Sequence, residues 1–156
     1  MCGIAGFISN QKENKINLKN LGNSFCKILN HRGPDDYGIW LDENHKTLLT
    51  HTRLSILDLD SRSKQPMIDY CNNLIIVFNG EIYNWRFLRS ILQKNGYKFK
   101  TESDTEVLLK GFHFWKEKVL NMLEGMFSFG IYNLNTQELF CARDRIGKKP
   151  FVYSET

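Results

Sequence analysis

The sequence lacks the features that mark several large classes of protein. It contains no run of about 18 uncharged apolar residues, and its first residues do not have the basic-then-apolar order of a signal peptide. Only 3 of the 156 residues are proline, while 42% are hydrophobic, a composition that excludes disordered and collagen-like chains. We therefore expect one soluble, cytoplasmic domain with its own hydrophobic core, which neither crosses a membrane nor is secreted.

Cysteine and histidine are few and scattered. The four cysteines, at positions 2, 26, 71 and 141, include no C-x-x-C pair, and the four histidines do not have H-x-x-x-H spacing. Zinc sites and disulfide scaffolds depend on such closely spaced groups. The sequence therefore predicts reduced thiols and no metal site.

Charge and glycine patterns argue against two further kinds of ligand. The 21 basic and 17 acidic side chains leave a net charge of +4, and the basic ones are spread along the chain. A nucleic-acid binder gathers them into a patch, whereas the short basic run at 143–149 is interrupted by Asp144. No Gly-rich phosphate loop occurs in the sequence. We expect no nucleic acid, ATP or magnesium on this chain.

Hydrophobic spacing predicts helices and strands along the chain. Strands are expected at residues 2–9, 37–41, 47–54, 74–78, 126–132 and 138–142 and near Phe151, with a hairpin loop at 133–136. Helices are expected after three capping positions, Asn17, Asn84 and the capping box Ser103–Glu106, with Gly96 ending the second in the left-handed conformation. This order predicts an α+β layered domain with mainly antiparallel sheets.

Cys2 is the first candidate for chemistry. Removal of Met1 leaves the thiol and the α-amine on one residue, and an amine with a pKa of about 7.7 to 8.0 is partly neutral at physiological pH. The amine is then able to take the thiol proton, directly or through a water, so nucleophile and base need no second side chain. A small buried cysteine in a terminal strand is the alternative, and position alone favours it.

Four further residues have groups suited to a substrate. Asn79 and Gly80 follow an apolar run and are able to form an oxyanion hole from a side-chain N–H and a backbone N–H, although an Asn-Gly pair alone is typical of a turn. The guanidinium of Arg53 suits a carboxylate, but also an ordinary surface position. Asp104 suits a substrate ammonium, although the first turn of any helix favours an acid.

Six separated motifs resemble the glutaminase domain of asparagine synthetase. They are residues 2–7 (CGIAGF), 31–35 (HRGPD), 53–56 (RLSI), 79–84 (NGEIYN), 103–106 (SDTE) and 142–147 (ARDRIG), in the order and spacing of that family. Each motif is weak alone, but the six together extend over nearly the whole chain. The Pro34–Asp35 pair is closer to asparagine synthetases than to the glucosamine-phosphate or phosphoribosyl-amine branches of the same amidotransferase class.

The resemblance implies a fold and a set of roles. Class II amidotransferases are N-terminal-nucleophile hydrolases, which implies a four-layer αββα sandwich with two antiparallel sheets. Cys2 is then the nucleophile, its α-amine the base, and Asn79 with Gly80 the oxyanion hole. The implied glutamine-binding residues are Arg53, Ile56, Leu57, Glu81 and Asp104. Among these, Arg53 is implied to bind the substrate carboxylate, and the two acids to bind its amine.

The resemblance also implies a larger protein. Whole family members join this domain to an ATP-dependent synthetase domain that adenylates aspartate and receives ammonia through a tunnel, and none of that domain occurs in the 156 residues. The chain stops earlier than the family's domain usually ends, so we expect an incomplete sheet edge. The expected partners are L-glutamine and a synthetase domain or subunit, and a homodimer is compatible with the sequence.

Three alternatives to this function stay open. In the first, the domain binds glutamine or a partner protein without turnover. In the second, the domain is a glutaminase whose ammonia goes to a sugar or to a carboxylate other than aspartate. Nucleic-acid binding through residues 143–149 is the third.

Overall fold

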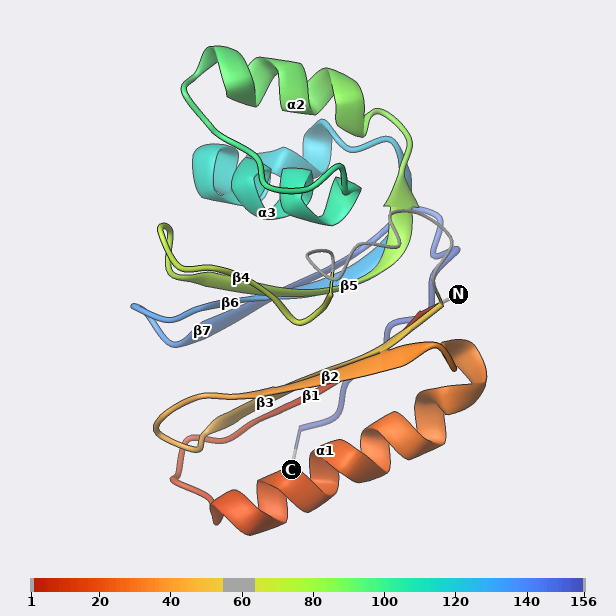
Figure 1. Ribbon diagram of the computed structural model, residues 1–156, viewed down its shortest axis with the longest axis vertical. Helices are drawn as coiled ribbons and strands as arrows, with labels where there is room; N and C mark the ends of the chain where they lie inside the picture. The colour runs from red at the N-terminus through yellow and green to blue at the C-terminus, as the bar shows by residue number, and fades with distance from the viewer. Residues whose placement is uncertain (1, 55–63, 156) are drawn as a thin grey trace.

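Two antiparallel sheets lie face to face in the computed structural model, which describes residues 2–54 and 64–155 (Figure 1). The first sheet has the strand order β1–β3–β2, with β1 at Gly3–Ile8, β2 at Asp36–Leu41 and β3 at Thr47–Arg53. The second has the order β4–β5–β6–β7, at Met67–Asp69, Leu74–Ile82, Gly125–Asn133 and Glu138–Arg143.

Helices cover the outer faces of both sheets. Helix α1 (Lys15–Leu29) lies below the first sheet in Figure 1, and α2 (Trp85–Lys94) and α3 (Asp104–Trp115) lie above the second. Short 3₁₀ helices follow α1 and α3, η1 at Asn30–Arg32 and η3 at Lys116–Asn121. The predicted α+β fold with two antiparallel sheets is confirmed.

The core consists of two apolar clusters separated by the second sheet. The larger cluster packs between that sheet and helices α2 and α3, and includes Phe78 and Ile82 of β5. The smaller cluster packs between the two sheets, and includes Leu49 of β3 with Ile75 and Val77 of β5. Alternate residues of β5 therefore face opposite ways, as the pleat of a strand requires.

Most predicted strands are confirmed, but three details differ. The apolar pattern ends at Phe78, whereas β5 continues to Ile82 because β6 pairs with every residue as far as that position. The short strand β4 was not predicted, since three residues are too few to show a period. The strand expected near Phe151 is absent from the described residues, and the apolar side chains of Val152 and Tyr153 are exposed there.

The helix caps were predicted less well than the helices. Asn84 is the N-cap residue of α2 as expected, but its side chain bonds to the backbone of Met122 and Glu124 and not to the N–H groups of the helix. Ser103 does cap α3, accepting a bond from the Glu106 N–H at 3.4 Å. The reciprocal bond of a capping box is not made, because the Glu106 carboxylate accepts N–H groups from residues 100 and 101. Gly96 has a φ of +87° after α2, as expected.

The first helix begins three residues earlier than predicted. Asn14, not Asn17, is its capping residue, because the Asn14 side chain accepts hydrogen bonds from the N–H groups of Ile16 at 2.8 Å and Asn17 at 3.3 Å. Asn17 lies inside the first turn of α1 and its side chain is exposed.

The two asparagines give a matched test of this cap. Asn14→Ala should lower the free energy of unfolding by about 1 kcal/mol, the usual cost of a lost N-cap, measured by urea denaturation followed by circular dichroism. Asn17→Ala should cost nothing, because the exposed Asn17 is not the cap and alanine is the strongest helix former. A larger loss from Asn17→Ala than from Asn14→Ala would contradict the assigned cap.

Candidate functional site

The space between the sheets changes from apolar to polar along the strands. Leu49 and Val77 lie in the apolar cluster between the sheets. Because side chains alternate along a strand, Arg53 of β3 and Asn79 and Glu81 of β5 face the same space farther along. Three residues predicted from two separate motifs are therefore brought to one end of the inter-sheet layer.

Cys2 lies at this same end of the molecule. Strand β1 begins beside the end of β3, with Gly3 opposite Thr52, so Cys2 lies next to Arg53 in the sheet. The Cys2 thiol is 3.9 Å from the Leu54 carbonyl oxygen, and the Cys2 carbonyl accepts a hydrogen bond from Arg32 Nε at 3.2 Å. The half-buried cysteine therefore lies at the polar end of the inter-sheet layer.

Asn79 and Gly80 lie inside a strand rather than in a turn. They pair with Ser128 and Phe127 of β6, and Asn79 is only 3% exposed. A Cβ at position 80 would collide with the Met126 carbonyl oxygen, so only glycine fits this approach of the two strands. The turn that an Asn-Gly pair favours in isolation is overridden here by pairing with β6.

Backbone hydrogen bonds of β5 alternate between its two neighbours. The Tyr83 N–H donates to the Glu124 carbonyl at 2.7 Å, which continues the β5–β6 ladder. The backbone N–H and C=O groups of odd-numbered residues in β5 therefore point to β6, and those of even-numbered residues point to the β4 side. Strand β4 covers this side only as far as Ile76, opposite Met67. The Gly80 N–H therefore points to a part of the edge that no described strand covers.

Asp104 and Glu81 bring two carboxylates together near this edge. Asp104 is the first residue of α3, and its Oδ2 accepts the Ile82 N–H at 3.0 Å. Burial raises the pKa of Asp104, and the negative charge of Glu81 raises it further. A bound cation would relieve both effects, which is a property expected of a site for a substrate ammonium.

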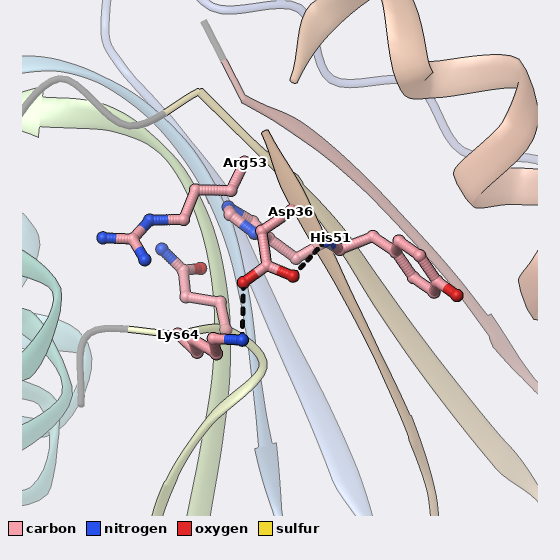
Figure 2. Close-up of a pocket in the computed structure, with 6 residues that line it drawn as sticks. Asp36, His51, Arg53 and Lys64 are labelled. Atoms are coloured by element: carbon pink, nitrogen blue, oxygen red, sulfur yellow. Dashed lines mark hydrogen bonds and ion pairs between the residues drawn. The ribbon is translucent and has the colours of Figure 1, made fainter. Parts of the chain in front are cut away.

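A polar pocket lies beside Arg53 (Figure 2). Its lining residues are Asp36, Tyr37, His51, Arg53, Lys64 and Gln65. Lys64 Nζ and Asp36 Oδ2 are 2.7 Å apart, and this bond lowers the pKa of Asp36. In Figure 2 the Arg53 side chain extends from β3 toward the second sheet. A guanidinium in this position suits an anionic group bound between the sheets.

Sequence reasoning missed His51, which is 2% exposed and lies two residues before Arg53 on the same face of β3. Its Nε2 is buried and has no hydrogen-bond partner within the described ranges. Burial lowers the pKa of His51 to about 4, although a backbone hydrogen bond at Phe78 opposes this effect. The imidazole is therefore neutral at physiological pH. Its spacing from Arg53 was the signal that would have revealed it.

The motif at residues 142–147 stabilises the turn that follows β7. Burial alone would raise the pKa of Asp144, but N–H groups of Lys149, Lys148 and Phe127 bond to its carboxylate and lower it. Arg143 donates to the carbonyls of Lys149 and Gly147, both at 2.6 Å. These bonds give the charged side chains of Arg143 and Asp144 a structural role in this turn.

Some predictions fall on residues that the structure does not describe. Ile56 and Leu57 lie in 55–63, outside the described residues. Within residues 2–54 and 64–155, no group of three or more His, Cys, Asp or Glu is arranged to hold a metal ion. In the same ranges no helix has the length and apolar character needed to cross a membrane.

A cysteine directly before β1 and next to an arginine of β3, at the end of the inter-sheet layer that Asn79 and Glu81 also face, is compatible with amide-transfer chemistry. The chain belongs to the glutamine amidotransferase domain family, whose sequence pattern matches residues 1–156. It is 37% identical over 159 residues to glutamine-hydrolysing asparagine synthetase 3 of Bacillus subtilis, covering 99% of this chain and 25% of that protein.

Two further relatives have similar names. The chain is 39% identical over 155 residues to asparagine synthetase 1 of Bacillus subtilis, covering 99% of this chain and 24% of that protein. It is 38% identical over 169 residues to a putative asparagine synthetase 2 of Methanocaldococcus jannaschii, covering 98% of this chain and 32% of that protein. The chain thus spans about a quarter to a third of the length of these relatives.

Solved structures share the fold. A glutamine phosphoribosylpyrophosphate amidotransferase from Bacillus subtilis, complexed with ADP and GMP, superposes with a TM-score of 0.62 at 22% identity, over 85% of this chain and 35% of that chain. A structure described as the allosteric regulatory enzyme of purine biosynthesis gives 0.61 at 23% identity, over 84% and 35% of the two chains. At this identity the likeness concerns the fold alone.

Acid should destabilise the fold through His51. Between its ordinary pKa of 6.5 and its native pKa of about 4, the unfolded chain binds a proton that the native protein does not. Stability that is present above pH 6.5 is therefore lost as the pH falls toward 4, by up to about 3 kcal/mol. Urea denaturation at a series of pH values should give a shallower dependence for His51→Asn than for the parent. Equal slopes would contradict burial of a neutral imidazole.

Proposed function

We propose that this chain hydrolyses the side-chain amide of glutamine to glutamate and ammonia through a thioester on Cys2. The observation that carries the proposal is the position of Cys2 beside Arg53, at the end of the inter-sheet space that Asn79 faces, in a chain of the glutamine amidotransferase family. The proposed fold type is that of N-terminal-nucleophile hydrolases, in which the first residue of the mature chain supplies both nucleophile and base.

The reaction proceeds in two acyl-transfer steps. With Met1 removed, the α-amine of Cys2 takes the thiol proton, and the thiolate attacks the side-chain carbonyl carbon of glutamine. The N–H groups of Asn79 and Gly80 stabilise the negative oxygen of the tetrahedral intermediate. The C–N bond then breaks, the proton is returned to the leaving nitrogen, and ammonia departs. Water attacks the thioester in the same way, which releases glutamate and the thiol.

Charges at the two ends of the site give it selectivity for free glutamine. Arg53 binds the α-carboxylate, while Asp104 and Glu81 bind the α-ammonium. Burial raises the pKa of Asp104 and the negative charge of Glu81 raises it further, which supports this assignment because a bound ammonium would offset both effects. A glutamine side chain within a polypeptide has neither free end, so it loses both interactions.

The relatives are named asparagine synthetases, which supports a use for the ammonia that the reaction releases. We infer an asparagine synthetase type of reaction, in which a further domain or subunit uses the ammonia. ATP and magnesium belong to that part and not to these 156 residues.

Cys2→Ala tests the nucleophile. Protein whose intact mass confirms loss of Met1 should release glutamate from glutamine, and folded Cys2→Ala should release none, because the thioester is unable to form. Circular dichroism verifies that both are folded. Turnover retained by Cys2→Ala would refute the mechanism. Release from neither protein, with glutamine binding seen by calorimetry, would instead favour a non-catalytic binding domain.

Two variants should separate catalysis from binding. Asn79→Ala should lower kcat by about 10²- to 10³-fold, the usual effect of removing one oxyanion donor. Arg53→Ala should mainly raise KM for glutamine, because the carboxylate contact is similar in the ground state and the transition state. Steady-state kinetics over a range of glutamine concentrations makes this distinction. A lost kcat with unchanged KM in Arg53→Ala would contradict its role.

A further inference from the structure

Two side chains take the place of a neighbouring strand on either side of Gly80. The Phe78 N–H donates to Gln65 Oε1 at 2.6 Å, and the Ile82 N–H donates to Asp104 Oδ2 at 3.0 Å. Residues 78, 80 and 82 are the even-numbered positions of β5 beyond the end of β4, so their N–H groups share one edge. The Gly80 N–H therefore lies between two fixed hydrogen bonds.

The end of β4 explains why a side chain is used at Phe78. Continuing the register from Met67 opposite Ile76 places Gln65 opposite Phe78. The Gln65 carbonyl, however, lies against Gly38 of β2, where it occupies the space that a Cβ at position 38 would need. With the backbone carbonyl turned toward the first sheet, the side-chain carbonyl of Gln65 accepts the Phe78 N–H instead.

The other half of the Gln65 amide reaches α3. Its Nε2 donates to Thr105 Oγ1 at 3.4 Å, and Thr105 directly follows Asp104 in the first turn of that helix. Thr105 is 5% exposed, so this contact is largely shielded from water. Gln65, the start of α3 and the end of β5 thus form a closed frame of hydrogen bonds around the Gly80 N–H.

We propose that Gln65 is a positioning residue of the glutaminase site, which orients the Gly80 N–H toward the reacting oxygen by fixing Phe78 on one side and the start of α3 on the other. This role rests on the proposed function, in which Gly80 is an oxyanion donor. Gln65 need not touch the reacting atoms. It acts through β5, because rotation of the peptide groups on either side of Gly80 would turn its N–H away from the oxygen.

The role predicts a loss of turnover more than a loss of binding. An oxyanion donor acts chiefly in the transition state, so its misplacement lowers kcat while KM changes little. Gln65→Met keeps the length of the side chain but removes both hydrogen bonds. We expect this variant to lower kcat for glutamine hydrolysis by about 10- to 100-fold, the range expected for a small misplacement of a catalytic group.

Two matched variants accompany Gln65→Met. Gln65→Glu retains an oxygen for the Phe78 N–H, so it should recover part of the lost kcat. Gln93→Leu removes an amide from an exposed position on α2, so its kcat and KM should equal those of the parent. A fall in kcat with unchanged KM in Gln65→Met, with kcat partly restored in Gln65→Glu, supports the positioning role. Equal kcat in Gln65→Met and the parent would refute it.

Amide hydrogen exchange followed by NMR tests the frame without any turnover. Gln65→Met should speed exchange of the Phe78 N–H at least 10-fold, since its acceptor is lost. The Val77 N–H, which faces β6 in the same strand, should exchange as in the parent. Unchanged exchange at Phe78 would overturn the proposal. If the parent releases no glutamate but Phe78 responds, the proposed function fails while the frame around Gly80 stands.

Discussion

The site depends on the difference in length between β4 and β5. Strand β4 has 3 residues and β5 has 9, so the end of β5 extends beyond its neighbour. Backbone N–H groups in a buried strand need partners, and Gln65 and Asp104 supply them at Phe78 and Ile82. Gly80 lies between these two positions. The unequal strands thus leave the Gly80 N–H at a part of the edge that no described strand covers.

The two facing sheets supply the rest of the site by continuing their alternation. Leu49 and Val77 pack together in the apolar part of the inter-sheet layer. Farther along the same strands, the same faces carry Arg53 and Asn79. The two inner sheet faces therefore provide both the core and the candidate site, and a rigid core holds the polar groups in place. The perturbed pKa values of His51 and Asp104 follow from the same burial.

Local patterns predicted what depends on neighbouring residues. Apolar spacing indicated α1, α3 and the strands of both sheets except β4, and glycine at position 96 indicated the left-handed turn after α2. Failures occurred where a distant segment decides. Asn79 and Gly80 form a strand because β6 pairs with them, and the Asn84 side chain bonds to the chain before β6 instead of to the first N–H groups of α2.

The sequence by itself determined the candidate chemistry, because cysteine, arginine, asparagine and acids in six spaced motifs are legible without coordinates. Only the tertiary structure decided how these groups are used. Gln65 and Phe78 are 13 residues apart and Ile82 and Asp104 are 22 apart, yet their hydrogen bonds frame Gly80. Such contacts depend on how the two sheets and α3 pack, and no local spacing encodes that packing. Register and burial therefore decide which N–H is left without a neighbouring strand and which imidazole is neutral.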